Sequence, residues 1–467
     1  SKLSPTELPF TSEDFEPQFK AVKELIPSML EGTKIVYSIN GLLSYTPDGT
    51  SLLGETEIKG LWSAAAVWIR EAPGVGKMIA QWMTNGFTEI DIHEMDISRF
   101  YSYARAESYV VARFNEAFNK TYGIVHPQEQ WVSERETRFS PFYARQKELG
   151  AVFYEAVGWE RPQWYNSNEK LVEEFGVTKR TNEWDSRWWS PIINAEHLAM
   201  RARAALIDLT AFAIFDISGN GALDFVQKMA VNQMNIKIGR AVYTPLLDPA
   251  AGIKSDLTIV RLAEDRFRVI TGGSDGPRDM KWFKDNLPSN NSVHIEDKTT
   301  SLCTLGLWGP RAQEILQSLT EDDVGIEALP FGRTKEISVR GNKVWLFRIS
   351  YVGEAGWEIY IPMEQGQEVW DLIWEAGKEF GLTAVGAGVY GTTGRIEKGY
   401  RLYGAELRSS YSIIEAGLSR PKIKEQDFIG KEALLKQREE EPVAQLCMLT
   451  VDDHASTKEA RYMLGGE

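Results

Sequence analysis

Apolar residues recur at two spacings along this chain, one typical of helices and one typical of strands. Near the start, a cap-like Ser12 precedes apolar residues at helical intervals, namely Phe15, Phe19, Val22, Leu25 and Ile26. Residues 34–49 have a strand-like pattern that ends in a Pro-Asp-Gly turn. The apolar stretch 60–69 predicts a short strand, followed by a helix that stops at Gly86.

Beyond residue 190 the pattern changes to alternating strands and helices. Strands are predicted at 212–219, 243–248, 256–262, 266–273, 302–310, 336–341, 343–350 and 357–362. Helices are predicted at 193–209, 222–231, 311–319 and 367–381. Strands mixed with short helices imply an α+β domain, and residues 445–453 begin one more strand.

Between these regions lies a stretch, residues 96–190, that is dominated by aromatic and charged side chains, and Pro191 marks its predicted end. The whole chain has 467 residues, which is typical of about three domains. Aromatic residues make up 11% of it. This excess indicates either a site for flat organic molecules or simply large cores.

Charge and composition exclude several classes of function. The 52 Lys+Arg and 66 Asp+Glu give a net charge of -14, which would repel a phosphate backbone, so no nucleic-acid partner is expected. Two cysteines exclude a disulfide scaffold; a single bridge stays open, but two buried free thiols are the expectation. The five histidines lack metal-ligand spacing, so no metal site is expected. The chain shows no membrane-length apolar run and no signal pattern, so neither membrane insertion nor secretion is expected.

Two glycine-rich motifs have two interpretations each. Gly386–Gly391 (GAGVYG) fits the dinucleotide-binding fingerprint, with Glu406 twenty residues further on. No strand–helix–strand unit surrounds it, which favours a turn that opens a helix. Gly74–Lys77 (GVGK) follows an apolar strand and enters a helix, where free N–H groups can bind an anionic or carbonyl oxygen. An ordinary strand-to-helix turn is the simpler explanation of that spacing.

Two further segments place carboxylates where a ligand could use them. Asp256 begins a strand that is otherwise apolar as far as Val260, so it is either a turn cap or a buried acid that binds an amine. Residues 350–360 (SYVGEAGWEIY) combine aromatic rings with glutamates. Rings can stack on a flat heterocycle while a carboxylate accepts its N–H groups. An exposed β-turn with a partly buried Trp is the alternative.

At these motifs the chain resembles a known family. Residues 190–430 resemble the folate-binding domain of the glycine cleavage aminomethyltransferase, and still more the C-terminal half of dimethylglycine oxidase, dimethylglycine dehydrogenase and sarcosine dehydrogenase. The matching segments include RAALIDLTAFAIFDISG, YTPLLDPAAGIKSDLTIVRL, RISYVGEAGWEIY and GRIEKGYRLYGAEL. SPFYARQKELGAVFYEAVGWERPQWY resembles the domain that joins their flavin and folate halves, and residues 40–86 resemble the last part of their flavin domain.

The resemblance implies a multidomain α+β chain of four units. They are the C-terminal part of an FAD-dependent amine oxidase-like domain (1–95), a linking central domain (96–190), a folate-binding aminomethyltransferase-like domain (191–425) and the start of a C-terminal barrel (426–467).

The resemblance also assigns roles to particular residues. Asp256 matches the catalytic acid beside the reactive folate nitrogen, and Glu358 matches the acid that binds the pterin ring. The other folate-site residues that it implies are Tyr243, Thr258, Tyr351, Tyr360 and Arg395. A flavin-contacting loop is implied at Trp68, Ile69, Arg70, Glu71, Gly74 and Gly76, although relatives often have His-Ser or His-Ala where this chain has Arg70 to Pro73.

These matches imply part of a flavin-dependent N-demethylating oxidoreductase of the dimethylglycine or sarcosine type. FAD accepts hydride from an N-methyl amine, and tetrahydrofolate captures the one-carbon unit as 5,10-methylenetetrahydrofolate. FAD is expected to be bound mainly by a segment outside this chain, in an N-terminal half or a partner chain. A stand-alone tetrahydrofolate-dependent aminomethyl or methyl transferase and a non-catalytic folate-binding module remain open. The compartments of the relatives, bacterial cytoplasm and mitochondrial matrix, are expected here.

Overall fold

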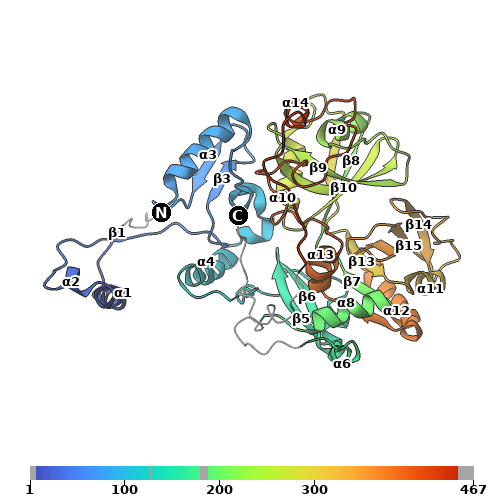
Figure 1. Ribbon diagram of the computed structural model, residues 1–467, viewed down its shortest axis with the longest axis horizontal. Coiled ribbons are helices and arrows are strands. Elements are labelled where there is room, and N and C mark those ends of the chain that lie inside the picture. Colours follow the sequence, from blue (N-terminus) through green and yellow to red (C-terminus); the bar gives the residue numbers. More distant parts are fainter. Residues whose placement is uncertain (1–6, 127, 179–187, 451–467) are drawn as a thin grey trace.

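The computed structural model describes residues 7–126, 128–178 and 188–450. Figure 1 shows a body built around β-sheets and an N-terminal arm that extends away from it. The arm contains β1 (Glu7–Leu8), α1 (Ser12–Leu25), α2 (Pro27–Leu30) and β2 (Asn40–Gly41). Helix α1 begins at the predicted Ser12. The strand predicted at 34–49 is wrong apart from β2, because only that dipeptide has a neighbouring strand to pair with among the described residues.

A hairpin and a helix follow the arm. Strand β3 (Leu52–Glu55) pairs antiparallel with β4 (Trp62–Ala65), and helix α3 (Ala72–Asn85) comes next. Gly86 ends α3 as predicted, with a left-handed φ of 79° that glycine adopts without strain. The glycines of the GVGK motif lie in the first turns of α3.

Residues 87–178, called the central segment below, link this hairpin to the larger body. Its main elements are α4 (Glu107–Tyr122), α5 (Tyr143–Glu148), β5 (Ala151–Ala156), β6 (Trp159–Tyr165) and α6 (Lys170–Glu174). Glu196, fully buried in the body, fastens the central segment by accepting hydrogen bonds from the backbone N–H of Tyr165 at 2.7 Å and from Asn168 at 2.8 Å. It also accepts from the backbone N–H of Gly386 at 2.9 Å.

The first sheet of the body has five strands in the order β12-β8-β11-β10-β9, all antiparallel. The strands are β8 (Ala213–Ser218), β9 (Arg240–Leu247), β10 (Ile253–Ala263), β11 (Arg266–Thr271) and β12 (His294–Asp297). Helices α9 (Ala222–Met229) and α10 (Gly276–Asp285) pack on one face through Phe225, Val226 and Phe283. The sheet is therefore covered by helices on one side and is free to face a second layer on the other.

The second sheet has six strands in the order β14-β15-β16-β13-β7-β17. The strands are β7 (Ala204–Asp208), β13 (Leu302–Trp308), β14 (Thr334–Val339), β15 (Asn342–Phe347), β16 (Gly356–Pro362) and β17 (Leu382–Ala384). Helices α11 (Ala312–Gln317) and α12 (Gly366–Gly377) cover its outer face. Helix α8 (Ile192–Ala202) precedes β7, so the single helix predicted over 193–209 is wrong in its second half.

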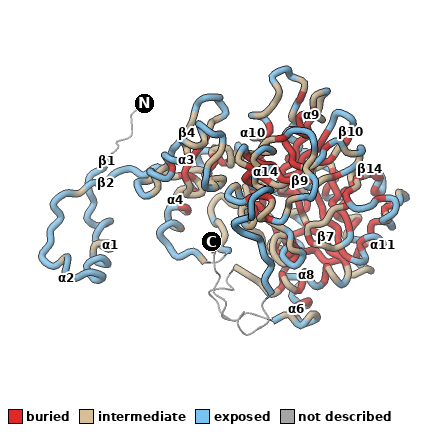
Figure 2. The backbone as a smooth tube through the Cα atoms, turned by 45° about the horizontal axis from the view of Figure 1, so that its top comes forward, coloured by how far each residue is buried: buried red, intermediate tan, exposed pale blue. Residues whose placement is uncertain are grey.

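The two sheets meet through an apolar cluster. Val260 and Ile270 of the first sheet pack against Phe347 and Tyr360 of the second. Figure 2 shows the buried residues concentrated in this body, whereas the arm is exposed along most of its length. The sheet contact brings β10 and β16 close together, and these strands carry the two predicted acids.

The last described part wraps back over the first sheet. A π-helical turn over 389–394 opens into α13 (Arg395–Glu397), as predicted for the GAGVYG motif, and α14 (Lys431–Gln437) lies further on. Residues 445–450 form no strand, and the rest of the predicted 445–453 strand lies outside the described residues. Cys303 is buried, but Cys447 is exposed, so the prediction of two buried thiols is half wrong. Within the described ranges no helix has the length and apolarity needed to cross a bilayer.

Candidate active site

Strand β10 places Asp256 on the face that the helices leave free. Leu257 and Ile259 point into the core under α9 and α10, so Asp256 and Thr258 point to the opposite face. Tyr243 on β9 lies opposite Thr258 in the strand register, and its hydroxyl donates to Oδ2 of Asp256 over 2.8 Å. Three predicted site residues therefore share one face of the first sheet.

Asp256 can change protonation near neutral pH. Burial raises the pKa of Asp256 to about 7, the hydrogen bond from Tyr243 opposes this rise, and the nearby carboxylates of Asp275 and Asp279 add to it. Both forms of the acid are therefore populated at physiological pH. Such a group can accept a proton from a bound amine and return it.

Glu358 is the second acid, and it lies on strand β16 of the second sheet with a side chain that is almost fully buried. Tyr360, two residues further along the same strand face, donates its hydroxyl to Oε2 of Glu358 over 2.5 Å. Burial raises the pKa of Glu358 to about 7, against the lowering effect of that hydrogen bond. The Tyr360 ring packs on Phe347 of the adjacent strand β15 with ring centroids 4.4 Å apart, and both rings belong to the apolar cluster between the two sheets.

The charges of both acids act on Tyr390, a residue that the sequence did not single out. Burial raises the pKa of Tyr390 well above its ordinary value, and the charges of Glu358, Tyr351 and Asp256 contribute to that rise. Its ring lies 5.0 Å from the ring of Tyr351 and 5.9 Å from that of Trp308. The signal in the sequence was the tyrosine inside GAGVYG, but the interpretation of that motif considered only its glycines.

Tyr351 and Arg395 belong to the same region but are engaged with the chain itself. The hydroxyl of Tyr351 donates to the backbone oxygen of Arg401 over 2.5 Å. Arg395 is buried and donates to the Gly391 oxygen at 2.7 Å and to Glu406 at 2.9 Å. These bonds make Arg395 a brace for the turn that carries Tyr390.

The predicted flavin loop lies apart from this cluster, at the N-terminal end of α3. Trp68 donates to the Ser44 oxygen at 3.1 Å, and Glu71 accepts from Ser51 at 3.2 Å, so both side chains hold the loop in shape. Ile69 is 95% exposed, and Arg70 is also exposed. A side chain at Gly74 or Gly76 would meet nothing within 4 Å, so the backbone there is open to a ligand. The other end of α3 reaches the first sheet through Trp82, whose ring faces the Lys254 ammonium at 5.5 Å.

The cluster around Asp256 and Glu358 suits a flat molecule rich in N–H groups. Carboxylates accept such N–H groups, and the half-buried ring of Tyr351, which packs on the buried Tyr390, supplies a flat apolar surface. A carboxylate with a pKa near 7 also suits a site that must handle one proton of an amine. Among the described residues, the side chains form no group of three or more metal-ligating residues.

Two family models match the chain. The GCVT N-terminal domain matches residues 142–422, and the FAD dependent oxidoreductase central domain matches residues 85–140. The first match contains every residue of the cluster described above. The second covers most of the central segment.

Several proteins are similar over most of this chain. 4-Methylaminobutanoate oxidase (formaldehyde-forming) of Paenarthrobacter nicotinovorans is 32% identical over 85% of this chain and 48% of its own length. Mitochondrial dimethylglycine dehydrogenase of Homo sapiens is 30% identical over 89% of this chain and 48% of its own length. The mitochondrial pyruvate dehydrogenase phosphatase regulatory subunit of Mus musculus is 28% identical over 94% of this chain and 51% of its own length. The chain thus spans about half the length of these relatives.

A solved structure has the same fold. The glycine cleavage system aminomethyltransferase T from Bartonella henselae matches with a TM-score of 0.54 and 23% identity, over 66% of this chain and 76% of that one. This likeness confirms the predicted α+β fold class.

Proposed function

The chain belongs to the GCVT N-terminal domain family, and we propose that it is the folate-binding part of a flavin-dependent N-demethylating oxidoreductase. The observation that carries this proposal is the pair of acids, the half-buried Asp256 and the buried Glu358, each held by a tyrosine hydroxyl. Its proposed product is 5,10-methylenetetrahydrofolate.

Each acid has its own task in this proposal. Glu358 accepts N–H groups of the pterin ring, and Tyr360 holds the carboxylate in place by its hydrogen bond. Asp256 orients the reactive amine of tetrahydrofolate, takes up its proton and offsets positive charge during transfer of the one-carbon unit. Tyr243 keeps Oδ2 of Asp256 in a fixed position. Truncating one partner of the Glu358–pterin pair would cost about 2–5 kcal/mol of binding.

In this proposal FAD is bound mainly by polypeptide outside this chain, with the loop at residues 68–76 as a contacting segment. When bound, FAD accepts hydride from an N-methyl amine. The names of the two relatives that oxidise such amines support this substrate class. The arm supports the need for further polypeptide, because it exposes apolar side chains such as Leu25 at 80%, Met29 at 74% and Val36 at 96%. The compartments proposed are the bacterial cytoplasm or, after relatives named as mitochondrial, the matrix.

Binding and turnover test this proposal separately. Isothermal titration with tetrahydrofolate should give one site per chain, and Glu358→Gln should weaken it while Asp256→Asn keeps it. Asp256→Asn should abolish the formation of methylenetetrahydrofolate from formaldehyde above the uncatalysed rate. An active Asp256→Asn variant would remove the assigned role, and a chain that does not bind tetrahydrofolate would refute the proposal.

A second candidate, a non-catalytic folate-binding module, is favoured by one observation. A relative named as a regulatory subunit matches the same stretch of the chain. This candidate predicts that the chain binds tetrahydrofolate without turnover. Asp256→Asn should then leave the binding unchanged and turnover still absent. The turnover measurement therefore separates the two.

A further inference from the structure

A cavity separate from the Asp256–Glu358 cluster lies where the central segment meets helix α10. It has a volume of about 430 Å³, and aromatic rings of Tyr101, Tyr103, Tyr109 and Tyr403 form much of its wall. Three of these tyrosines come from the central segment, and Tyr403 comes from the segment that wraps the first sheet. The cavity thus exists only because these two parts of the chain are packed together.

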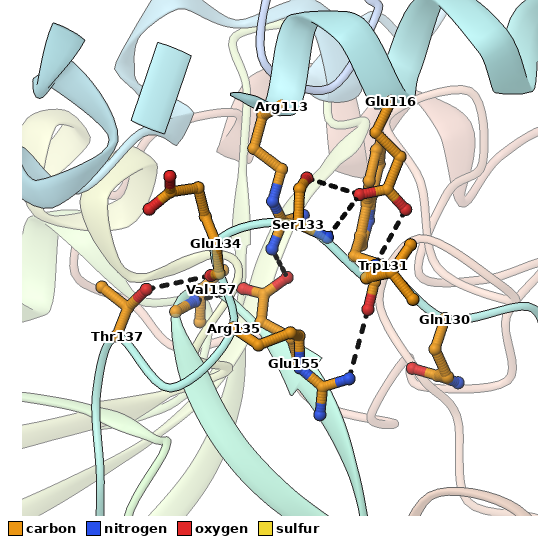
Figure 3. A network of polar contacts seen from close by, with 12 residues as sticks. Arg113, Glu116, Gln130, Trp131, Ser133, Glu134, Arg135, Thr137, Glu155 and Val157 are labelled. Carbon is orange, nitrogen blue, oxygen red and sulfur yellow. Dashed lines mark hydrogen bonds and ion pairs between the residues drawn. The ribbon is translucent and has the colours of Figure 1, made fainter. Parts of the chain in front are cut away.

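Arg113 brings a positive charge into this cavity from helix α4. Its side chain is 3% exposed, and Nη2 donates to Oε2 of Glu155 over 2.8 Å. The guanidinium also lies 4.7 Å from the ring of Trp131, and Figure 3 shows it between Trp131 and Glu155. Among the described residues, its buried Nε has no hydrogen-bond partner. A buried guanidinium with an unused N–H group requires an acceptor.

Arg278, from helix α10, presents a second guanidinium to the same cavity. The residue is 3% exposed, Nη2 donates to Oδ1 of Asp275 over 2.9 Å, and the ring of Tyr403 lies 4.6 Å away. Its buried Nε also has no partner within the described part of the chain. Two incompletely bonded arginines thus line one cavity from opposite parts of the fold.

The charges around the cavity narrow the ligand class. Glu155 and Asp275 already neutralise much of the positive charge of the two guanidiniums. This disfavours binding of a compact inorganic anion. A carboxylate on an organic body fits better, because it accepts the unused N–H groups while its body contacts the tyrosine rings. Glu94 also lines the cavity without a side-chain partner in the described ranges, and can face a cationic end. We propose that this cavity binds the carboxylate of a small organic molecule.

Arg113→Lys is the first test, since lysine keeps the charge beside Glu155 but loses the planar set of N–H groups. Isothermal titration of the 467-residue chain with N,N-dimethylglycine should show binding that weakens about tenfold or more in this variant. Arg278→Lys should have the same effect, which keeps the test valid if one variant folds poorly. The matched control is Arg135→Lys, because Arg135 forms a similar ion pair with Glu160 nearby but does not line the cavity.

Comparison ligands identify what the cavity recognises. N,N-dimethylethanolamine, which lacks the carboxylate, should not bind, and 3-methylbutanoate, which lacks the amine, should bind more weakly than dimethylglycine through the loss of Glu94. A second carboxylate source is the glutamate of tetrahydrofolate. If the arginine variants weaken binding of tetrahydrofolate but not of tetrahydropteroate, the result would support the proposal with that glutamate as the ligand.

Equal affinities in wild type and both arginine variants, for dimethylglycine and for tetrahydrofolate, would overturn the proposal. Glu358→Gln serves as the reference for the folate site, so that failure of the cavity and failure of the proposed function are distinguishable. If Glu358→Gln weakens binding at the folate site but leaves binding at the cavity unchanged, the inference about the cavity holds.

Discussion

Tyr243 on β9 donates its hydroxyl to Oδ2 of Asp256 on β10, across adjacent strands and over 2.8 Å. This bond is the factor that most strongly lowers the pKa of Asp256 against the effect of burial. The balance between the two leaves the acid titrating at about 7. Small changes at Tyr243 therefore alter the fraction of Asp256 that is ionised at neutral pH.

Tyr243→Phe should move the activity profile toward higher pH. Without the donated hydrogen bond the ionised form of Asp256 is less stable, so its pKa rises by about 1 unit. The acidic limb of the rate of methylenetetrahydrofolate formation, measured from pH 5 to 9, should move by the same amount. Tyr351→Phe is the control, because that hydroxyl donates to a backbone oxygen instead. An unchanged limb in Tyr243→Phe would show that Asp256 does not govern the profile.

Glu358→Gln should make the protein less sensitive to alkaline pH. The pKa of Glu358 is raised to about 7 in the folded state, so the folded protein holds this proton to higher pH than the unfolded chain. Its stabilising contribution is present at pH 4 and is lost as the pH rises through 7. The variant should therefore gain roughly 1–3 kcal/mol over wild type at pH 8, with little change at pH 4–5.

Urea denaturation at both pH values measures this difference. The exposed Glu379→Gln is the matched control, and it should leave the free energy of unfolding unchanged at either pH. A Glu358→Gln variant that is destabilised equally at pH 5 and pH 8 would mean that the carboxylate is ionised in the fold.

Local patterns in the sequence correctly predicted most strands of the body. The predictions were wrong where contacts with distant parts of the chain determine the secondary structure. Strand β7 has apolar residues on both faces, since it is paired on both sides in a covered sheet, and its residues Ala204 to Ile207 form a continuous apolar run just after Arg203 at the end of α8. Such a continuous run fits a helix as well as a buried strand. The strand predicted at residues 34–49 was wrong for a different reason, because a strand-like pattern forms a strand only where a partner strand is available.

The candidate site was predictable only in part. The carboxylates of Asp256 and Glu358 were visible as polar positions in apolar strands, but their roles came from the resemblance to dimethylglycine and sarcosine dehydrogenases, which the relatives confirm. Tyr390 was not identified, because its contacts come from three separate segments of the chain. The assigned roles of the site residues and the boundaries of the four units stay predictions.

Gly306→Ala should disturb both stability and ligand binding. Gly306 lies opposite Glu358 in the register of β13 and β16, and an added Cβ would lie 1.9 Å from the ring of Trp308. The buried Trp308 ring must move, at a cost of about 1–3 kcal/mol, and its movement disturbs Tyr390, on which it packs. Thermal unfolding and tetrahydrofolate titration measure the two effects. Gly74→Ala, with open space around its Cβ, is the control, and equal behaviour of the two variants would contradict the packing argument.

Lys424→Met should detach the last described part of the chain, which wraps over the first sheet, from that sheet. It should thereby weaken the Asp256 site indirectly. The ammonium of Lys424 donates to the backbone oxygens of Gln227 at 2.6 Å, Ala230 at 2.5 Å and Asn232 at 3.2 Å. Asn232 in turn donates to the backbone oxygen of Tyr243 at 2.9 Å. Methionine keeps the length but removes the donor from three backbone oxygens, two of them on buried residues, so the free energy of unfolding should fall by about 2–4 kcal/mol.

The same loss should loosen Tyr243 and lower the rate of methylenetetrahydrofolate formation more than the affinity for tetrahydrofolate, because Glu358 lies on the other sheet. Lys431→Met is the matched control, since the Lys431 ammonium also donates to backbone oxygens, of Glu425 and Gln426, but on the exposed surface. Denaturant unfolding and turnover should change little in that control. Equal stability losses in the two lysine variants would mean that burial of the Lys424 contacts adds nothing to the fold.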